Sequence, residues 1–466
     1  MRSVGRLSSV LLLSLVSLLA FCVYLLTLAP DLTWANNGVD GGELITAVYT
    51  HGLPHPPGYP LYRLLGQVIG RLPLYPIAYR FNLFSAIAAA LAAGVVSVTV
   101  YQTAAERRSG SLTAVAVGLT LAFAALVWSQ ATITEVYGLA LLLLALFLWA
   151  LLTERPSWLT GLFLGLSLTA HLTAWLMLPL ALALTPRRRW PRLLAGLLVG
   201  LLPLALLPWL ADPASPVVWG DPTTLRGWWW LVSGQLYRGY TFALPLADLP
   251  TRLTAWTPIL LSQFTWAGIP LIVAGVMMLP RSERRVAYGL AATAVLYLLF
   301  ALFYLPDDAI NHTLPAWLLL GLLLSPAYQR LSILALCLPL ILLLINFSGQ
   351  NLRADQQVRE RAEALLPAIP RAAIVETPGD PTIFALWYFQ HVEGQRPDVV
   401  LVDEDLFAHD WYRARLASLY PALAGLEQPD LSVFQAANVG ERPYCQATIN
   451  THLAPYNLTC AEETSS

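Results

Sequence analysis

Two carboxylates three positions apart, Asp40 and Glu43, are the side chains of this sequence whose type and spacing best suit acid–base chemistry. They lie in the segment 31–62, DLTWANNGVDGGELITAVYTHGLPHPPGYPLY. If a helix begins near Gly41, this spacing places both carboxylates on one face. Close like charges raise the pKa of one carboxyl group, which suits a general base at a membrane surface. An N-terminal helix cap is the alternative, because Asp before a helix with an acid three residues later is a common capping pattern.

The turn that follows, HPPGYP at 55–60, carries further polar groups beside this segment. Its prolines fix their own φ angles and Gly58 reaches conformations closed to other residues, so the turn is predicted to be rigid. His55 has the chemistry to hydrogen-bond a phosphate or a sugar, and we assign it, with Tyr59, to binding of a substrate or donor. A plain loop is the alternative interpretation here.

Two later segments carry isolated polar side chains beside apolar runs. Glu135 and Tyr137 lie in ATITEVYG, and His171 lies in SLTAHLTAW. Glu135 and His171 each have a structural alternative. Glu135 would be a helix cap, and His171 would be a hydrogen-bonded interhelical histidine. We assign all three residues to substrate or donor binding.

The loop 211–256 combines aromatic residues with arginine. Its tryptophans, Trp219 and Trp228 to Trp230, suit either an interfacial aromatic belt or a platform that stacks on a sugar or a prenyl chain. Arginine binds phosphate bidentately, so we assign Arg238 to a lipid phosphate, with a solvated arginine as the alternative.

The elements that position these residues must be membrane helices. Of 466 residues, 57% are hydrophobic, 12% are charged and the mean hydropathy is +0.60, whereas soluble domains carry about 25% charged residues. All 27 basic residues are arginine, the net charge is −1 and no basic face stands out, which argues against a nucleic-acid partner. In the polar tail, Cys445 and Cys460 are able to pair if the tail lies in an oxidising compartment.

Hydropathy predicts about eleven membrane spans. They cover residues 9–29, 81–103, 112–130, 136–153, 158–170, 172–185, 193–210, 257–279, 286–304, 313–329 and 331–347. The first run is too long for a signal peptide and ends in TLAP, so we expect it to be retained as a helix. The pair 158–170 and 172–185 is short for two crossings, and one tilted helix is the alternative.

Arginine placement favours two crossings at 158–185. If all segments cross, every short loop on the side of the N-terminus carries arginine, as the positive-inside rule expects of the cytoplasmic side. A single crossing would place Arg187 to Arg189 on the other side and break this pattern. We therefore expect a multi-pass protein of the cell membrane with a cytoplasmic N-terminus.

The opposite, extracytoplasmic face then receives nearly every acid and histidine outside the tail. These are Asp31, Asp40, Glu43, His51, His55, Glu135, His171, Asp212, Asp221, Asp248, Asp307, Asp308 and His312. The spans themselves hold essentially no charged residue, so the path that an ion-coupled transporter needs is missing. The tail, 348–466, has two strand patterns, RAAIVETPGD and RPDVVLVDED, with a helical pattern between them, and we expect a small α/β domain on the same face.

Six segments together resemble one family, the GT-C type multi-pass glycosyltransferases whose animal members are O-mannosyltransferases of plexins and related receptors. Bacterial members of this family were long catalogued as a domain of unknown function. The segments are DGGELITAVYTHGLPHPPGYPLY at 40–62, RFNLFSAIAAAL at 80–91, TITEVYGL at 132–139, GLSLTAHLTAW at 165–175, WGDPTTLRGWWWLVSGQLYRGY at 219–240, and AIVETPGDPTIFALWYFQHVEGQRPDVVLVDEDLFAHDWY at 373–412. They span most of the chain in order.

This resemblance implies a membrane all-α, GT-C-like bundle at 1–347, with external loops at 30–80 and 211–256, followed by an extracytoplasmic α/β domain at 348–466. In such enzymes an acid of the first external loop is the catalytic base, so the resemblance implies Asp40 as base with Glu43 in support. Asp221 falls in a family-like motif and joins the donor-binding assignment. The segment SGQLYRGY departs from the family pattern, in which a more basic run precedes the tyrosine.

The implied function is transfer of mannose or another hexose from a polyprenyl-phosphate donor, with inversion, to an extracytoplasmic acceptor such as Ser or Thr of an exported protein, or a glycan. An arginine or a divalent cation would stabilise the leaving phosphate. No tightly bound cofactor is expected, and no Gly-rich nucleotide fingerprint is present. A lipid-linked saccharide transporter or flippase and a non-catalytic membrane scaffold are the alternatives, and the first would need polar residues along a path through the spans.

Overall fold

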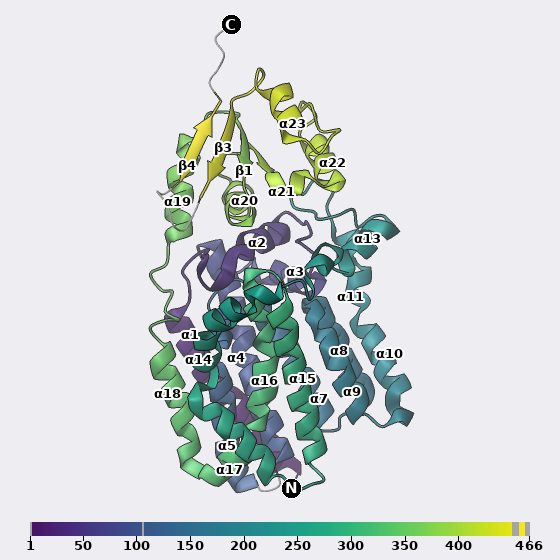
Figure 1. Cartoon of the computed structure of the whole chain (residues 1–466), viewed down its shortest axis with the longest axis vertical. Coiled ribbons are helices and arrows are strands. Elements are labelled where there is room, and N and C mark those ends of the chain that lie inside the picture. The colour runs from purple at the N-terminus through teal and green to yellow at the C-terminus, as the bar shows by residue number, and fades with distance from the viewer. Residues whose placement is uncertain (1, 105–106, 450–455, 462–466) are drawn as a thin grey trace.

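Long apolar runs fold as helices because a helix satisfies its own backbone hydrogen bonds where water is absent. The computed structural model describes residues 2–104, 107–449 and 456–461, and shows a bundle of helices with an α/β part at the end opposite the N-terminus (Figure 1). The bundle helices are α1 (Arg2–Thr27), α4 (Ile77–Thr103), α5 (Arg107–Ala122), α6 (Ala125–Ala131), α7 (Tyr137–Leu152), α8 (Ser157–Ala170), α9 (Leu178–Leu184), α10 (Trp190–Gly200), α11 (Leu202–Ala205), α12 (Leu207–Leu210), α14 (Leu249–Met278), α15 (Arg284–Phe303), α16 (Leu314–Leu323), α17 (Ser325–Leu331) and α18 (Cys337–Asn346).

The chain is a multi-pass membrane protein. Among the described residues, six helices are long and apolar enough to cross a membrane, or seven if α5 and α6, bent by 68°, form one span. Each predicted apolar segment lies in one of the bundle helices or in a run of them. The number of eleven crossings and the orientation in the membrane stay predictions.

The segment 158–185 forms two antiparallel stretches, as the arginine pattern predicts. His171 is extended, with φ −160° and ψ 127°, and separates α8 from a 3₁₀ turn (Leu172–Met177) and α9. At the start of α15 Arg285 donates to the carbonyl of Ala183, whereas Tyr297, farther along α15, donates to the carbonyl of Thr173. Helix α9 therefore runs antiparallel to α15.

Two Gly-x-x-x-Gly motifs pack α8 against α10, a signal that the sequence analysis missed. A Cβ atom on Gly161 would lie 1.9 Å from the carbonyl oxygen of Leu193, and one on Gly196 would lie 1.9 Å from that of Trp158. Such close backbone contact is typical of small residues between membrane helices. Gly165 meets Leu197 in the same order as Gly161 meets Leu193, so α8 and α10 are parallel and the chain reverses at both ends of α9.

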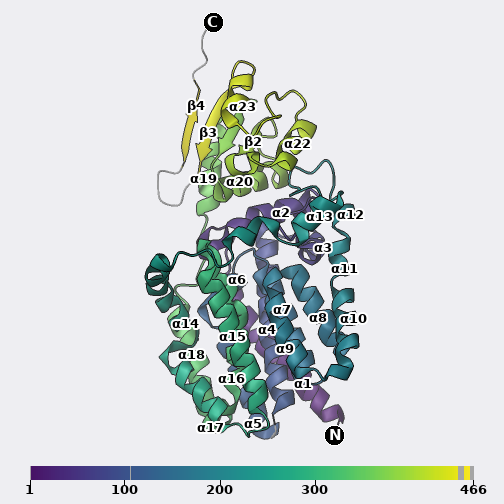
Figure 2. The ribbon, with the colours of Figure 1, turned by 45° about the vertical axis from the view of Figure 1, so that its right-hand side comes forward.

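Short helices lie between the bundle and the α/β part, as both views show (Figure 1, Figure 2). They are the 3₁₀ helix η1 (Ala35–Asp40), α2 (Gly41–Tyr49), α3 (Pro60–Ile69), α13 (Leu225–Val232), and the 3₁₀ helices η4 (Gln235–Tyr240), η5 (Leu246–Asp248) and η6 (Asp307–Thr313). The loop before α13 is fixed to the first external loop, because Leu53 and Val218 form a β-bridge and the Leu53 amide donates to the carbonyl of Val217 at 2.8 Å.

The tail folds as the predicted α/β arrangement. Its elements are α19 (Gln357–Leu365), β1 (Ile374–Thr377), α20 (Asp380–Trp387), a π turn η9 (Tyr388–Val392), β2 (Val400–Asp403), α21 (Glu404–Phe407), α22 (Asp410–Leu419), α23 (Leu431–Asn438), β3 (Tyr444–Thr448) and β4 (Asn457–Cys460). The sheet order is β2-β1-β3-β4, with β1 parallel to both of its neighbours and β4 antiparallel to β3. Cys445 and Cys460 are opposite each other in this last pair and form a disulfide.

The α/β part shares a hydrophobic core with the short helices that follow Asp40. Side chains of α2 and α3, among them Leu44 and Tyr62, share one hydrophobic cluster with Phe384 and Tyr388 of the α/β part. A Cβ atom on Gly42 would lie 2.3 Å from the carbonyl oxygen of Phe384, so α2 and α20 are in backbone contact. The α/β part is therefore positioned directly on the helix that follows Asp40.

Candidate functional site

A cavity of about 1390 Å³ lies between the α/β part and the end of the bundle next to it. Its wall includes most of the residues assigned from the sequence: Asp40, His55, Tyr59, Glu135, Tyr137, His171 and Arg238. These come from four separate segments of the chain, so polar residues that are distant in the sequence gather in one place. The carboxyl edge of the sheet adds Asp380 and Asp405 from the opposite side.

Asp40 and Glu43 do not form a paired-carboxylate site on one helix face. His55 lies between them: its Nδ1 is 2.5 Å from Glu43 Oε2, and its Nε2 is 3.6 Å from Asp40 Oδ2. Glu43 also accepts a 2.9 Å hydrogen bond from the His55 backbone amide. The Asp40 carboxylate makes no capping hydrogen bond to α2, so the helix-cap alternative is wrong.

The three groups differ in access to the cavity. The Asp40 side chain is 36% exposed, whereas those of His55 and Glu43 are 10% and 0% exposed. Glu43 therefore holds the imidazole from behind, and Asp40 is the carboxylate that a substrate can reach. Tyr59, whose hydroxyl is 3.0 Å from His55 Nε2, completes the hydrogen bonding of the ring.

Charge and burial set the protonation of this group. Burial alone would lower the pKa of the His55 imidazole, but attraction by Glu43 and Asp40, with the Glu43 hydrogen bond, raises it to about 10. Burial inside the cavity raises the pKa of the Asp40 carboxyl group to about 6, with His55 opposing the shift and Glu43 and Asp308 adding to it. At neutral pH His55 is thus a cation, and Asp40 is a carboxylate with a basicity suited to accepting a proton.

Local backbone geometry explains how this arrangement is reached. Asn36 and Asn37, just before Asp40, have φ of 58° and 62°, and Tyr59, after the His-Pro-Pro-Gly turn, has φ of 39°. Residues other than glycine rarely adopt positive φ, and such positions cluster at functional sites where the surroundings enforce them. The two ends of the first external loop are therefore held in conformations that direct Asp40 and His55 toward each other.

Arg238 is the one basic residue with permanent charge in the described wall of the cavity. Six carboxylates line the same cavity, namely those of Asp40, Glu135, Asp307, Asp308, Asp380 and Asp405. Arg238 extends from η4 between Tyr237 and Tyr240, and within the described residues its guanidinium makes no hydrogen bond or ion pair. A free guanidinium in an acidic cavity is equipped to bind an anion.

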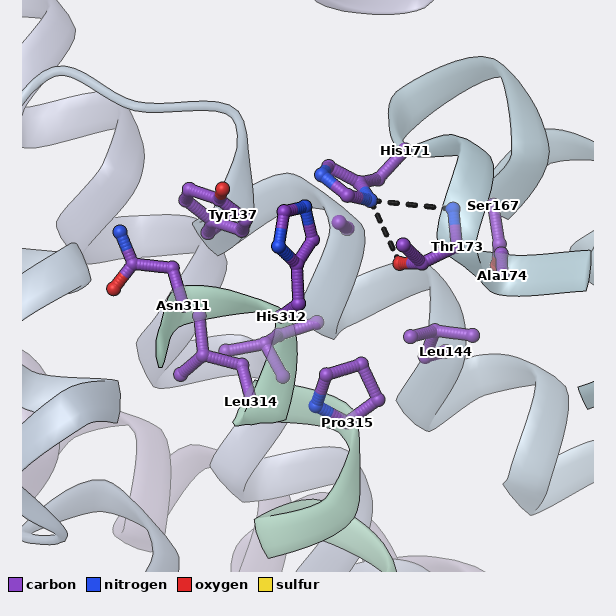
Figure 3. Close-up of a pocket in the computed structure, with 12 residues that line it drawn as sticks. Tyr137, Leu144, Ser167, His171, Thr173, Ala174, Asn311, His312, Leu314 and Pro315 are labelled. Atoms are coloured by element: carbon purple, nitrogen blue, oxygen red, sulfur yellow. Dashed lines mark hydrogen bonds between the residues drawn. The ribbon is translucent and has the colours of Figure 1, made fainter. Parts of the chain in front are cut away.

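His171 lies opposite a histidine that the sequence analysis left unassigned. Its ring centroid is 5.2 Å from that of His312 on η6 and 5.2 Å from that of Tyr137, as Figure 3 shows. Tyr304 packs on the other side of His312, with a centroid distance of 4.8 Å. The contact joins positions 141 residues apart, so sequence spacing gave no signal for it.

Other functional candidates were missed or lie elsewhere. Asp380 follows β1 at the start of α20, and the carboxyl ends of parallel strands are common ligand sites, so the TPGDP turn carried a usable signal. Burial raises the pKa of Asp380 to about 7, with Asp40 and Glu43 adding to the shift. Asp221 does not line the cavity; its carboxylate accepts from Thr223 in the exposed turn before α13.

A divalent cation is not supported by a ready set of ligands. Among the described residues, no three His, Cys, Asp or Glu side chains are grouped so that they could hold a metal ion. Asp307 and Asp308, which have the chemistry of metal ligands, both line the cavity without a third ligand beside them.

Two parts of the chain match models of one protein family. Residues 40–193 match the family model described as the protein O-mannosyl-transferase TMEM260 N-terminal domain, and residues 358–419 match TMEM260-associated domain 2. The chain is 29% identical to mouse protein O-mannosyl-transferase TMEM260 over 86% of its own length and 63% of that protein. It is 21% identical to the Dictyostelium discoideum protein of the same name over 90% of its length and 61% of that protein. The chain thus spans less than two thirds of these curated relatives.

A solved structure shows the same fold. The crystal structure of ArnT from Cupriavidus metallidurans, bound to undecaprenyl phosphate, superposes with a TM-score of 0.54 and 14% sequence identity, covering 86% of this chain and 91% of that one. The matched models cover both the stretch that contains Asp40, His55 and His171 and the first half of the α/β part. The chain therefore has the fold of ArnT, and residues 40–193 and 358–419 are similar to the two domains described for the TMEM260 protein O-mannosyl-transferases.

Proposed function

We propose that this protein is a glycosyltransferase that moves a hexose, as in mannosylation, from a polyprenyl-phosphate donor to a hydroxyl group of an exported protein or glycan. The observation that carries this proposal is the Asp40 carboxylate, which faces a cavity of about 1390 Å³ beside a buried His55–Glu43 pair. The names and the fold of the similar proteins support the same reaction class.

The chemistry is an inverting transfer with Asp40 as general base. Asp40 accepts the proton of the acceptor hydroxyl while its oxygen attacks the anomeric carbon, and the bond from that carbon to the phosphate oxygen breaks. The phosphate leaves with the bonding electrons, and the free Arg238 guanidinium stabilises its charge. His55, protonated and held by Glu43, positions Asp40 and keeps its carboxylate ionised in a cavity that otherwise favours the neutral acid.

The cavity has a side suited to each substrate. Near His171 its wall is apolar and includes Leu168, Phe300 and Trp175, and the last side chain is 52% exposed at the bundle surface. A prenyl chain in the bilayer fits that side. The opposite side is the polar edge of the sheet, where an acceptor from the aqueous phase would enter. The Cys445–Cys460 disulfide supports an extracytoplasmic location for this part of the protein.

A reconstituted transfer assay tests the proposal. Purified protein is incubated with mannosyl polyprenyl phosphate and a Ser/Thr-containing peptide, and the products are analysed by mass spectrometry. The expected products are the glycosylated peptide and free polyprenyl phosphate. Movement of the donor across a proteoliposome membrane without sugar transfer would replace the proposal by a flippase. Transfer from a nucleotide sugar alone would refute the assigned donor class.

We expect the transfer rate to fall in acid with a midpoint near pH 6. The pKa of Asp40 is raised to about 6, and only the carboxylate accepts a proton, so kcat/KM should drop about tenfold per pH unit below that value. In His55→Gln the imidazolium that opposes the raised pKa is lost, and the midpoint should move to higher pH. Initial rates from pH 4.5 to 8 measure both profiles, and coincident midpoints would contradict the role given to His55.

Arg238→Gln should weaken transfer by roughly 10- to 100-fold, because one charge-assisted hydrogen bond to the phosphate is worth about 1.5–3 kcal/mol. Arg238→Lys should recover part of the loss, since a lysine keeps the charge but not the bidentate geometry. Arg226→Gln is the matched control, because Arg226 is not part of the cavity wall. Equal rates for wild type and Arg238→Gln would exclude this arginine from phosphate binding.

A further inference from the structure

We infer that His171 and His312 form a hydrogen-bonding site for the phosphate of the lipid donor, next to Arg238. This inference rests on the proposed function and extends it to a residue, His312, that no sequence pattern singled out. The two rings lie next to each other in the cavity wall (Figure 3). Their centroids are 5.2 Å apart and their planes are tilted by 58°.

The hydrogen bonds of His171 leave one nitrogen free for a ligand. Its Nδ1 lies 2.7 Å from the Thr173 hydroxyl and accepts from the Thr173 backbone amide at 3.3 Å, and an N–H donor requires that Nδ1 carry no proton. Neutral His171 therefore carries its proton on Nε2. No described residue accepts a hydrogen bond from that nitrogen, and the ring lines the cavity. His171 thus presents one N–H group without a partner to whatever occupies the cavity.

His312 also has a ring nitrogen without a hydrogen-bond partner among the described residues. The residue is only 8% exposed, yet its Nδ1 has no hydrogen-bond partner among the described residues. The Ala309 carbonyl, three residues earlier in η6, lies close enough to the ring to favour its protonated form. A buried ring nitrogen without a partner costs free energy, and native proteins retain such groups mainly where a ligand or water completes them.

The charges around the pair select an anion with a small head group. Asp308 is the carboxylate whose charge acts on His312, and it favours the protonated imidazole. Two adjacent imidazoles cannot both be protonated at low cost, but a phosphate that contacts both rings from the main cavity would relieve their repulsion. Sugars lack the negative charge that a protonated imidazole and the Arg238 guanidinium attract.

Size restricts the phosphate to one side of the pair. Behind the rings lies a pocket of about 10 Å³ between Ala140, Leu144, Ser167 and Pro315, which has room for about one water molecule. A phosphate does not fit there, so it must lie on the side of the main cavity. Ring contacts run from His312 through Tyr304 to Tyr240, next to Arg238 in η4. These contacts link the histidine pair to η4, the element that carries Arg238.

Binding of the lipid without its sugar tests this inference. Affinities of polyprenyl phosphate and of the uncharged polyprenol are measured by native mass spectrometry or fluorescence titration for wild type, His171→Phe and His312→Phe. Phenylalanine keeps a ring against Tyr137 or Tyr304 and removes both nitrogens. We expect each variant to bind polyprenyl phosphate about tenfold more weakly and polyprenol as wild type does. His51→Asn is the control, since His51 is exposed, lies outside the cavity and has φ of 56°, which Asn tolerates.

The outcomes separate this inference from the proposed function. If wild type binds polyprenyl phosphate and both variants bind it equally well, the inference is wrong while the proposed function stands. If wild type binds polyprenol and polyprenyl phosphate alike, both fail. A loss of polyprenol binding in the variants would assign the pair to packing. His171→Gln, which keeps an N–H donor, should bind more tightly than His171→Phe. Competition by inorganic phosphate at equal potency would show a site for free phosphate instead of a lipid.

Discussion

Asp40→Asn should lower the transfer rate by roughly 10²- to 10⁴-fold, the usual contribution of a general base, while donor binding stays near the wild-type value. The amide keeps the size of the carboxylate but cannot accept the proton of the acceptor hydroxyl. The loss should therefore be found in kcat, with KM for the donor little changed. Steady-state kinetics with mannosyl polyprenyl phosphate and a peptide acceptor measures both constants.

The exposure and hydrogen bonds of the neighbouring acids explain why Asp40, and neither Glu43 nor Glu135, is proposed as the base. Glu43 is 0% exposed and both of its oxygens are engaged by His55, so it cannot reach a substrate. Glu135 lines the cavity but is only 3% exposed and accepts from the Val136 amide. Asp248→Asn is the matched control, because Asp248 is exposed and is not part of the cavity wall. Wild-type turnover in Asp40→Asn would remove Asp40 from the mechanism.

Glu43→Gln distinguishes positioning from base catalysis. The variant removes a charge that holds His55 through two hydrogen bonds, and the imidazole should lose both its orientation and its positive charge at neutral pH. The effect on Asp40 is indirect, so the rate should fall less than in Asp40→Asn. Because the sequence shows only the i,i+3 spacing, it predicted the importance of both acids but not the division of labour between them.

The sequence predicts features that depend on local pattern and misses those that depend on tertiary contact. The periodicity and length of the apolar segments located the bundle helices. The strand patterns that precede TPGD and VDED located β1 and β2. Arginine placement predicted that the polar residues of the predicted external loops share one side, and most of the assigned ones line one cavity; the orientation of that side in the membrane stays a prediction. His55 between Asp40 and Glu43 was not predictable, because it depends on a turn that begins twelve residues after Glu43 and on the left-handed backbone of Tyr59.

Contacts between distant segments explain the remaining misses. His312 contacts His171 because α15 brings the chain back to the end of the bundle where His171 lies. Asp380 lines the same cavity as Asp40 because the sheet packs on α2. Composition and periodicity carry no information about such contacts between distant segments. The Gly-x-x-x-Gly pairs of α8 and α10 are different, since their spacing alone predicts a close helix contact and would have supported the two crossings at 158–185.

An ion cluster joins the predicted first external loop to the tail, and breaking it should destabilise their contact. Arg359 of α19 pairs with Asp31 and Glu393, whose side chains are 2% and 6% exposed. Arg359→Ala would leave two buried carboxylates without a cation, and breaking a buried pair in this way costs about 3–5 kcal/mol. The opening of the α/β part should become roughly 10²- to 10³-fold more frequent. Hydrogen exchange of the amides of β1 and α20 measures this opening.

Replacing the whole cluster should restore most of the stability. The triple variant Asp31→Asn, Arg359→Met, Glu393→Gln removes the three buried charges and leaves only Glu363, a 52% exposed partner of Arg359. Uncharged residues often substitute for buried ion pairs without loss because no desolvation penalty remains. The asparagine introduced at position 31 would still accept from the Leu32 amide, as the Asp31 carboxylate does at 2.8 Å. Arg353→Ala, at an exposed arginine without an ion pair in the described structure, should leave exchange unchanged. If the single and triple variants opened equally, unpaired charge would not be the cause. Because α20 contacts α2 at Gly42, an opened α/β part should also release Asp40, and transfer should fall in Arg359→Ala and recover in the triple variant.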